Sequence, residues 1–200
     1  MISIMDYGAG NLKSVVKSFD YIGAETKVIS MGSELNEAER LVLPGVGAFG
    51  AAVSNLRKRG LYYELQEFLS KGRPFLGICL GMQLLLEGSE EAPETRGFSL
   101  MKGHCRRFRK GKVPQIGWNR VQYRGRPPSL LRDVDEGACF YFIHSYYVPF
   151  IQTEGWTIAT SDYYGDFVSV AEAGHLAAVQ FHPEKSGEAG LRLLRNWIKP

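Results

Sequence analysis

Short apolar runs alternate with longer stretches of helical spacing through the first half of the chain. The apolar runs are typical of buried strands and cover Ile2–Met5, Thr26–Ser30, Arg40–Leu43 and Pro74–Ile78. Apolar residues recur at helical spacing over residues 12–22, which Gly23 closes, and over residues 50–72, and a further helical pattern begins at Met82. Strands and helices in alternation predict right-handed crossovers and a parallel sheet covered on both faces.

The second half changes to short β runs separated by turns. These runs fill residues 98–179 and include Cys139–Val148 and Trp156–Thr160, and an amphipathic helix over Leu191–Ile198 closes the chain, with Ser186 as a cap near its start. No internal repeat, low-complexity tract or linker interrupts the pattern. We therefore expect one domain over residues 1–200, with an α/β fold in which a mostly parallel central sheet carries an antiparallel extension.

Charge and composition exclude several classes of function. Lys and Arg number 24 against 21 Asp and Glu, and the net charge of +3 is too balanced for a chain devoted to nucleic acid or anionic membranes. No run approaches the roughly 20 apolar residues of a membrane span, and the N-terminal sequence lacks a signal-peptide pattern. We expect a cytoplasmic protein.

The three cysteines are an odd number and form no CxxC pair, which argues against a disulfide framework or a thiolate zinc site. The sequence predicts neither a metal nor a cofactor. Cys105 and Cys139 have no supporting turn and are expected as buried structural residues. Cys79 has a different setting.

Cys79 lies where an apolar strand meets a helical pattern, with Gly77 and Gly81 on either side. This G-x-C-x-G spacing is the thiol version of a nucleophile elbow. The glycines allow the chain to reverse sharply without Cβ clashes. Free N–H groups at the helix start favour a thiolate, and the N–H of Leu80 is placed to bind an oxyanion.

His182 has a similarly informative setting. Pro183 favours an extended conformation for His182, and residues two apart in an extended segment project to the same face. Glu184 can therefore steady the imidazole while its other nitrogen faces Cys79. A cysteine, a histidine and a carboxylate make a catalytic triad; on the His182 segment alone, a solvent-facing turn is an equal alternative.

Two specific motifs together resemble the class I, triad-type glutamine amidotransferases. They are Gly77-Ile-Cys79-Leu-Gly81-Met-Gln83 and Phe181-His182-Pro-Glu184. Four further segments are similar to the glutaminase subunits of imidazole glycerol phosphate synthases. They are Asp6-Tyr-Gly8-Ala-Gly10-Asn11-Leu, Leu43-Pro-Gly45-Val-Gly47-Ala-Phe49, Gly117-Trp118-Asn119 and Ile143-His-Ser145-Tyr146. The resemblance therefore runs from residue 3 to about 186. The resemblance implies the single-domain, flavodoxin-like class I fold.

The resemblance also implies an activity. Cys79 would attack the side-chain amide of L-glutamine, His182 would protonate the departing ammonia, and water would release glutamate. Gly47 and Leu80 would donate oxyanion hydrogen bonds. Gln83, Ser145 and Tyr146 match positions that hold the substrate in the family. Without the resemblance, Gln83 is equally well explained as an amide on a helix surface, and Ser145 and Tyr146 as hydroxyl residues at a strand end.

The resemblance further implies a second protein, a (β/α)₈-barrel cyclase that receives the ammonia and makes imidazole glycerol phosphate and AICAR from PRFAR in histidine biosynthesis. Asn11 and Trp118 match the docking face, with a core tryptophan as the alternative for Trp118. The basic stretch 106–112 reads as a solvated hairpin or as a patch for an acidic face of the partner.

Three other functions stay open at this point. One is a glutaminase subunit for another acceptor, such as the pyridoxal phosphate synthase type, which the segments around Asp6 and Trp118 disfavour. A cysteine peptidase of the same architecture is disfavoured by Gln83 and the His182–Glu184 segment. A non-catalytic regulatory subunit would have lost members of the triad, and all three are present.

Overall fold

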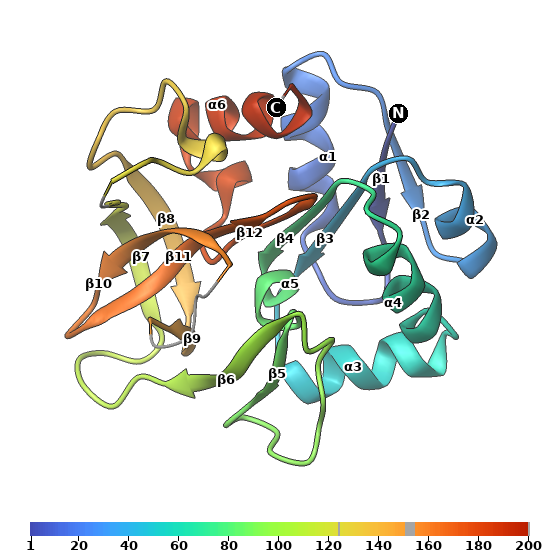
Figure 1. Ribbon diagram of the computed structural model, residues 1–200, viewed down its shortest axis with the longest axis horizontal. Helices are drawn as coiled ribbons and strands as arrows, with labels where there is room; N and C mark the ends of the chain where they lie inside the picture. Colours follow the sequence, from blue (N-terminus) through green and yellow to red (C-terminus); the bar gives the residue numbers. More distant parts are fainter. Residues whose placement is uncertain (124, 151–154, 200) are drawn as a thin grey trace.

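One mixed sheet runs through the computed structural model, which describes residues 1–123, 125–150 and 155–199 (Figure 1). Its strand order is β2–β1–β3–β4–β12–β11–β9–β6–β5, with β10 paired to β11, and a separate two-stranded ribbon joins β7 to β8. The strands are β1 (Ile2–Met5), β2 (Thr26–Ile29), β3 (Leu41–Gly45), β4 (Phe75–Cys79), β5 (Leu86–Ser89), β6 (Met101–Arg107), β7 (Gln115–Arg120), β8 (Cys139–His144), β9 (Tyr146–Pro149), β10 (Thr157–Asp162), β11 (Asp166–Ala173) and β12 (Leu176–Val179).

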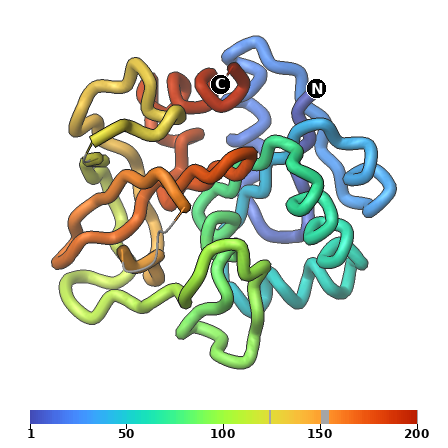
Figure 2. Tube along the Cα trace, viewed as in Figure 1, coloured from blue at the N-terminus to red at the C-terminus, as the bar shows by residue number. Residues whose placement is uncertain are grey.

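Helices cover both faces of the sheet. They are α1 (Leu12–Tyr21), α2 (Gly32–Glu37), α3 (Phe49–Lys58), α4 (Tyr62–Ser70), α5 (Leu80–Gln83) and α6 (Gly187–Ile198), with 3-10 turns η1 (Ser129–Leu131) and η2 (Pro183–Lys185). Figures 1 and 2 show α3 and α4 on one side and α1 and α6 on the other. Two apolar clusters match these layers, because one contains Phe49 and Leu65 and the other contains Phe19 and Leu194.

The predicted sheet is confirmed in both halves. Strands β2, β1, β3, β4 and β12 are mutually parallel, and this order is the flavodoxin-like one. The antiparallel extension follows, since β11 runs antiparallel to β12 and to β9, and β9 runs antiparallel to β6. The carboxyl ends of β3, β4 and β12 therefore meet at one edge, where ligands bind in open α/β sheets.

Several predicted elements differ in their bounds. The helical stretch 50–72 is two helices, because the chain turns at Gly60, which has φ +68°. The helix expected from Met82 is instead the four-residue α5, and the buried run that follows enters β5. Short buried apolar runs fit a strand as well as a helix, so periodicity alone did not separate them. Helix α2 carried no such pattern and was not predicted.

Two polar residues account for the remaining differences. The β run 139–148 breaks at Ser145, which separates β8 from β9. Ser186 does precede α6, but its side chain does not cap the helix. Its Oγ donates to the His182 carbonyl (2.6 Å) and accepts the Tyr141 N–H (3.0 Å). Ser186 therefore ties the turn after β12 to β8.

The turn between β4 and α5 has the strained geometry expected of an elbow. Cys79 adopts φ 54° and ψ −104°, a positive-φ conformation that costs a non-glycine residue about 1–3 kcal/mol. A Cβ on Gly77 would lie 2.7 Å from the Gly81 carbonyl oxygen, and a Cβ on Gly81 would overlap the Leu43 carbonyl oxygen. The two glycines thus permit a close approach of β4, α5 and β3 that no other residue allows.

This packing predicts the stability of a glycine variant. Gly81→Ala should lower the free energy of unfolding by about 3 kcal/mol or more, because the new methyl group overlaps backbone that cannot yield. Gly32→Ala is the matched control, since a Cβ there meets only the side chain of Glu64. Urea denaturation of the two variants measures the difference, and equal stability would contradict this account of the elbow.

Candidate active site

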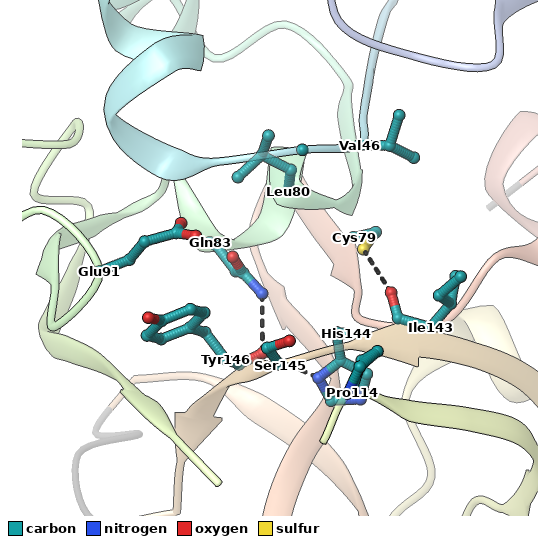
Figure 3. Close-up of a pocket in the computed structure, with 11 residues that line it drawn as sticks. Val46, Cys79, Leu80, Gln83, Glu91, Pro114, Ile143, His144, Ser145 and Tyr146 are labelled. Atoms are coloured by element: carbon teal, nitrogen blue, oxygen red, sulfur yellow. Dashed lines mark hydrogen bonds between the residues drawn. The ribbon is translucent and has the colours of Figure 1, made fainter. Parts of the chain in front are cut away.

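A cavity of about 260 Å³ opens at the carboxyl edge of β3 and β4 (Figure 3). Figure 3 shows the Cys79 sulfur between Leu80 and Val46 on one side and Ile143 on the other. The cavity is lined by Val46, Gly47, Cys79, Leu80, Gln83, Glu91, Pro114, Ile143, His144, Ser145 and Tyr146. The structure thus brings the predicted nucleophile, oxyanion residues and substrate residues around one hollow.

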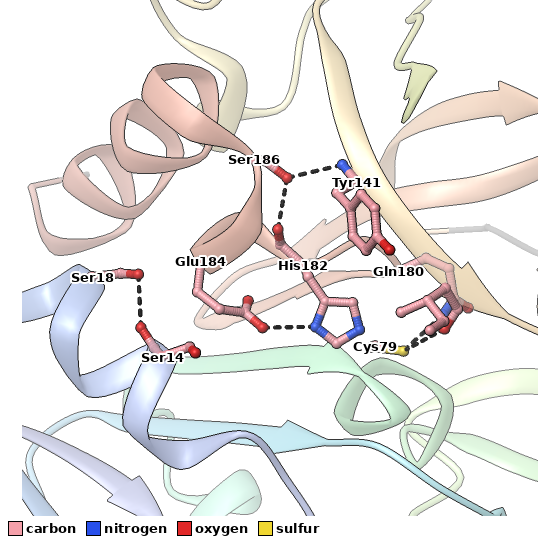
Figure 4. A network of polar contacts seen from close by, with 9 residues as sticks. Ser14, Ser18, Cys79, Tyr141, Gln180, His182, Glu184 and Ser186 are labelled. Atoms are coloured by element: carbon pink, nitrogen blue, oxygen red, sulfur yellow. Dashed lines mark hydrogen bonds and ion pairs between the residues drawn. The ribbon is translucent and has the colours of Figure 1, made fainter. Parts of the chain in front are cut away.

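His182 and Glu184 form a buried pair directly behind the nucleophile (Figure 4). The distance from His182 Nδ1 to Glu184 Oε1 is 2.7 Å, and the two side chains are only 3% and 2% exposed. The imidazole lies between Glu184 and Cys79, and its Nε2 has no hydrogen-bond partner within the described part of the chain. One ring nitrogen is therefore oriented by the carboxylate, and the other faces the sulfur.

The electrostatics of this pair favour a protonated imidazole. Burial by itself lowers the pKa of His182, but the Cys79 sulfur and the Glu184 carboxylate more than compensate and raise the pKa to about 10. At neutral pH His182 is therefore an imidazolium beside the Cys79 sulfur. It has the proton that a departing amine needs.

Both residues that were expected to bind an oxyanion border the cavity. Gly47 and Leu80 both border the cavity beside Cys79, and Gly47 has φ +102°, a conformation that favours glycine. Among the described residues, neither N–H donates to a turn or loop carbonyl. Phe49, the first residue of α3, donates its N–H to Glu91 Oε2 (2.7 Å), which holds the end of this segment in place.

The predicted substrate residues also border the cavity. The hydrogen bonds of Gln83 limit what its amide can offer to a ligand. Gln83 Nε2 donates to the Tyr146 carbonyl (2.9 Å) and to Gln180 Oε1 (3.1 Å). Both of its amide protons are therefore engaged, so only Oε1 remains to accept a hydrogen bond from a ligand. Ser145 lies at the break between β8 and β9, with Tyr146 directly after it.

Sequence reasoning missed three further polar residues of the site. Glu91 comes from the irregular segment after β5, where no periodic pattern marks it. His144 was visible as one of four histidines, and Gln180 lies two residues before His182, but no motif assigned a role to either. Their positions depend on pairing between strands that are far apart in the chain.

His144 is a neutral member of this group. Burial lowers its pKa to about 4, and the charge of His182 acts in the same direction, although the Tyr146 carbonyl opposes them. Its Nδ1 lies 2.8 Å from that carbonyl oxygen, which can only accept, so Nδ1 carries the proton. His144 lines the cavity, and its buried Nε2 is then an acceptor that has no partner among the described residues.

Two buried groups near the nucleophile are held in their neutral forms. Burial and the charge of Cys79 raise the pKa of Tyr7, whose hydroxyl lies against Gly45. Burial and the charge of Glu91 raise the pKa of Cys105, which is a buried thiol as expected. Cys139 was expected to be buried, and that prediction is wrong. It lies on the outward face of β8, whose side chains alternate between exposed and buried.

The two residues expected at a docking face come from different parts of the fold, Trp118 from the β7–β8 ribbon and Asn11 from the loop between β1 and α1. Trp118 in β7 is 59% exposed, which excludes the core alternative, and its ring packs edge-on against Tyr141. Asn11 directly precedes α1, next to Gly10, where a Cβ would lie 3.7 Å from the Pro44 carbonyl oxygen.

The basic stretch 106–112 is not a hairpin. Strand β6 pairs with β5 and β9, whereas β7 pairs with β8, so the stretch connects two sheets instead of turning within one. Its charged side chains are exposed, but Phe108 is buried against Tyr147 and Phe167 and anchors the connection.

The ion pair at the triad predicts a titration. In the intact protein, NMR of the His182 ring should show a pKa near 10, and Cys79→Ala should lower it, because the interactions with the sulfur are lost and burial remains. The folded pKa exceeds the ordinary value of 6.5. The stabilisation from this proton is therefore complete below pH 6.5 and is lost as pH rises through about 10. Titration near 6.5 in both proteins would contradict the ion pair.

Comparisons with known proteins agree with this geometry. The family model described as glutamine amidotransferase class-I matches residues 3–199. The imidazole glycerol phosphate synthase subunit HisH of Chlorobaculum tepidum is 46% identical, with 100% of each chain covered. The subunit of the same name from Moorella thermoacetica is 44% identical and covers 98% of this chain and 93% of its own length.

Two solved structures share the fold at low sequence identity. A crystal structure of a glutamine amidotransferase has a TM-score of 0.76 at 18% identity, covering 99% of this chain and 97% of its own. PurLQS from Thermotoga maritima has a TM-score of 0.75 at 17% identity, covering 98% and 96%. The chain described here therefore belongs to the class I glutamine amidotransferases, and within them to the family of the HisH subunits.

Proposed function

We propose that the protein is the glutaminase subunit of an imidazole glycerol phosphate synthase and supplies ammonia for histidine biosynthesis. The observation that carries the proposal is the buried His182–Glu184 pair aimed at the strained Cys79. The name of its full-length relatives supports the choice of synthase. The proposal takes residues 1–200 as one catalytic domain that acts in the cytoplasm, and it is consistent with three cysteines that are all free.

In the proposed reaction, the Cys79 thiolate attacks the side-chain carbonyl carbon of L-glutamine. The N–H groups of Gly47 and Leu80 bind the oxyanion of the tetrahedral intermediate, and one such donor is worth about 10²–10³ in rate. His182 gives its proton to the departing nitrogen, so the C–N bond breaks and ammonia leaves. Water activated by His182 then cleaves the thioester, which releases glutamate and restores Cys79.

The polar groups of the cavity fit the other end of glutamine. Glu91 and the Oε1 of Gln83 are acceptors on the cavity wall, and both complement an α-ammonium group. Ser145 and Tyr146 lie on another part of the same wall and offer donors for the α-carboxylate. A substrate held between them presents its amide to Cys79.

The names of the relatives describe a subunit, and the surface beside the cavity supports a partner. We take this partner to be a (β/α)₈-barrel cyclase, which docks over the edge that carries Asn11 and Trp118. Exposed Ile116 and Val46 extend the apolar surface next to Trp118 and the cavity. A partner seated there would receive ammonia without its passage through bulk water. Within the described residues, no helix is long and apolar enough to cross a bilayer.

The division of labour between two subunits predicts a split in activity. In a complex with the cyclase, Cys79→Ala should abolish synthesis from glutamine and leave synthesis from added ammonia intact, because only the source of ammonia is lost. A coupled assay with each nitrogen source measures both rates. Loss of both activities in a correctly assembled complex would refute the proposed function.

The docking role of Trp118 predicts a loss of affinity. Trp118→Ala should weaken cyclase binding by about 2 kcal/mol, as expected for a tryptophan at an interface centre. Tyr21→Ala is the matched control, because Tyr21 is 74% exposed at the far end of α1. Calorimetric titration compares the two variants. Unchanged affinity for Trp118→Ala would exclude this residue as an anchor.

A further inference from the structure

Gln180 makes the one directed amide contact to the nucleophile's sulfur that the described residues provide. It follows β12, two residues before His182, and is completely buried. Its Nε2 lies 3.6 Å from Cys79 Sγ (Figure 4). Neither the triad nor the substrate site accounts for a fully buried amide at this position.

A chain of hydrogen bonds fixes which end of the Gln180 amide faces the sulfur. The Tyr146 carbonyl can only accept, so the group 2.9 Å from it must be the NH₂ of Gln83. That NH₂ is also the donor to Gln180, 3.1 Å away, so Gln180 presents its oxygen to Gln83. The NH₂ of Gln180 must then point to Cys79, so the Tyr146 carbonyl in β9 sets the orientation of both amides in this relay.

The sulfur needs such a donor because its surroundings offer few others. Cys79 is 6% exposed, and the helix behind it is only the four residues of α5. Besides the His182 imidazole, its other polar neighbour is the Ile143 carbonyl oxygen at 4.0 Å, which accepts a hydrogen bond from a thiol but can donate none to a thiolate. Gln180 can donate to the anion, and hydrogen bonds to charged groups are the stronger ones.

We propose that Gln180 is a catalytic residue that stabilises the Cys79 thiolate by hydrogen bonding, and that Gln83 is a positioning residue that holds Gln180 in the donating orientation. Gln83 also offers its Oε1 to the cavity, so the residue that meets the substrate is bonded to the residue that meets the nucleophile. This inference rests on the proposed function, because it takes Cys79 as the nucleophile.

Other ionisable groups surround the sulfur from several elements. His182 and Glu184 come from the segment after β12, His144 from β8 and Cys105 from β6. Tyr7 follows β1, and Glu91 follows β5 and borders the cavity. The test therefore changes Gln180 and Gln83 alone, neither of which titrates, and leaves each of these groups in place.

The test is the pH dependence of alkylation by iodoacetamide in the full chain, read for each cysteine by peptide mass spectrometry. Gln180→Met removes the donor at similar volume and should move the pH midpoint of Cys79 alkylation upward by about one unit. Gln83→Met should produce a smaller shift in the same direction. The exposed Cys139 is an internal control whose profile should not change.

Gln115→Met is the matched control variant. Gln115 is also a buried glutamine, but its Oε1 has no partner among the described residues, and the side-chain hydrogen bonds of the Cys79 sulfur go to Ile143 and Gln180 instead. Its midpoint should equal that of the unmodified protein. A cooperative thermal unfolding transition identifies the variants that fold. If Gln180→Met does not fold, the relay is tested with Gln83→Met instead.

Three outcomes are distinguishable. Upward shifts for Gln180→Met and Gln83→Met, with none for Gln115→Met, support the relay. An unchanged midpoint of Cys79 alkylation in folded Gln180→Met overturns the relay and leaves the nucleophile assignment intact. Where only Gln83→Met folds, an unchanged midpoint in that variant has the same meaning. If Cys79 in the unmodified protein reacts no faster at neutral pH than Cys139, the proposed function fails before the relay is tested.

Discussion

The conformation of Cys79 is the constraint on which the rest of the site depends. Its positive φ is an unfavourable one, and the close packing of β4, α5 and β3 holds it there. Gly77 and Gly81 make that packing possible, because a Cβ at either position would meet backbone. With the chain so held, Cys79 and Leu80 both border the cavity, and the N–H of Leu80 donates to no turn or loop carbonyl of the described residues.

The two halves of the sheet contribute different parts of the chemistry. The parallel half carries the nucleophile at the end of β4 and the histidine after β12, and these two strands are neighbours. The antiparallel half supplies the opposite wall of the cavity, through the end of β8 and the start of β9. The hydrogen bonds from Gln83 to Tyr146 and Gln180 join the halves, so the substrate wall and the nucleophile are mechanically connected.

The sequence predicted those features whose signals are local. The elbow at Cys79 and the extended segment at His182 each have a turn that only a few residue types allow. The bounds of α5 were missed because apolar periodicity does not separate a short helix from a buried strand. The division at Gly60 was missed because the apolar spacing continues across the turn. Glu91 and Gln180 were missed because their partners come from distant segments. The exposure of Cys139 follows from strand alternation once β8 is known.

The central claim is that the strained Cys79 is the group that attacks glutamine. A glutamine analogue with an electrophilic diazoketone in place of the amide tests it most directly, in the complex with the cyclase. The account predicts one covalent adduct, on Cys79, with the analogue's oxygen bound by the N–H groups of Gly47 and Leu80 in the crystal structure of that complex. An adduct on Cys105 or Cys139, or none at all, would contradict it.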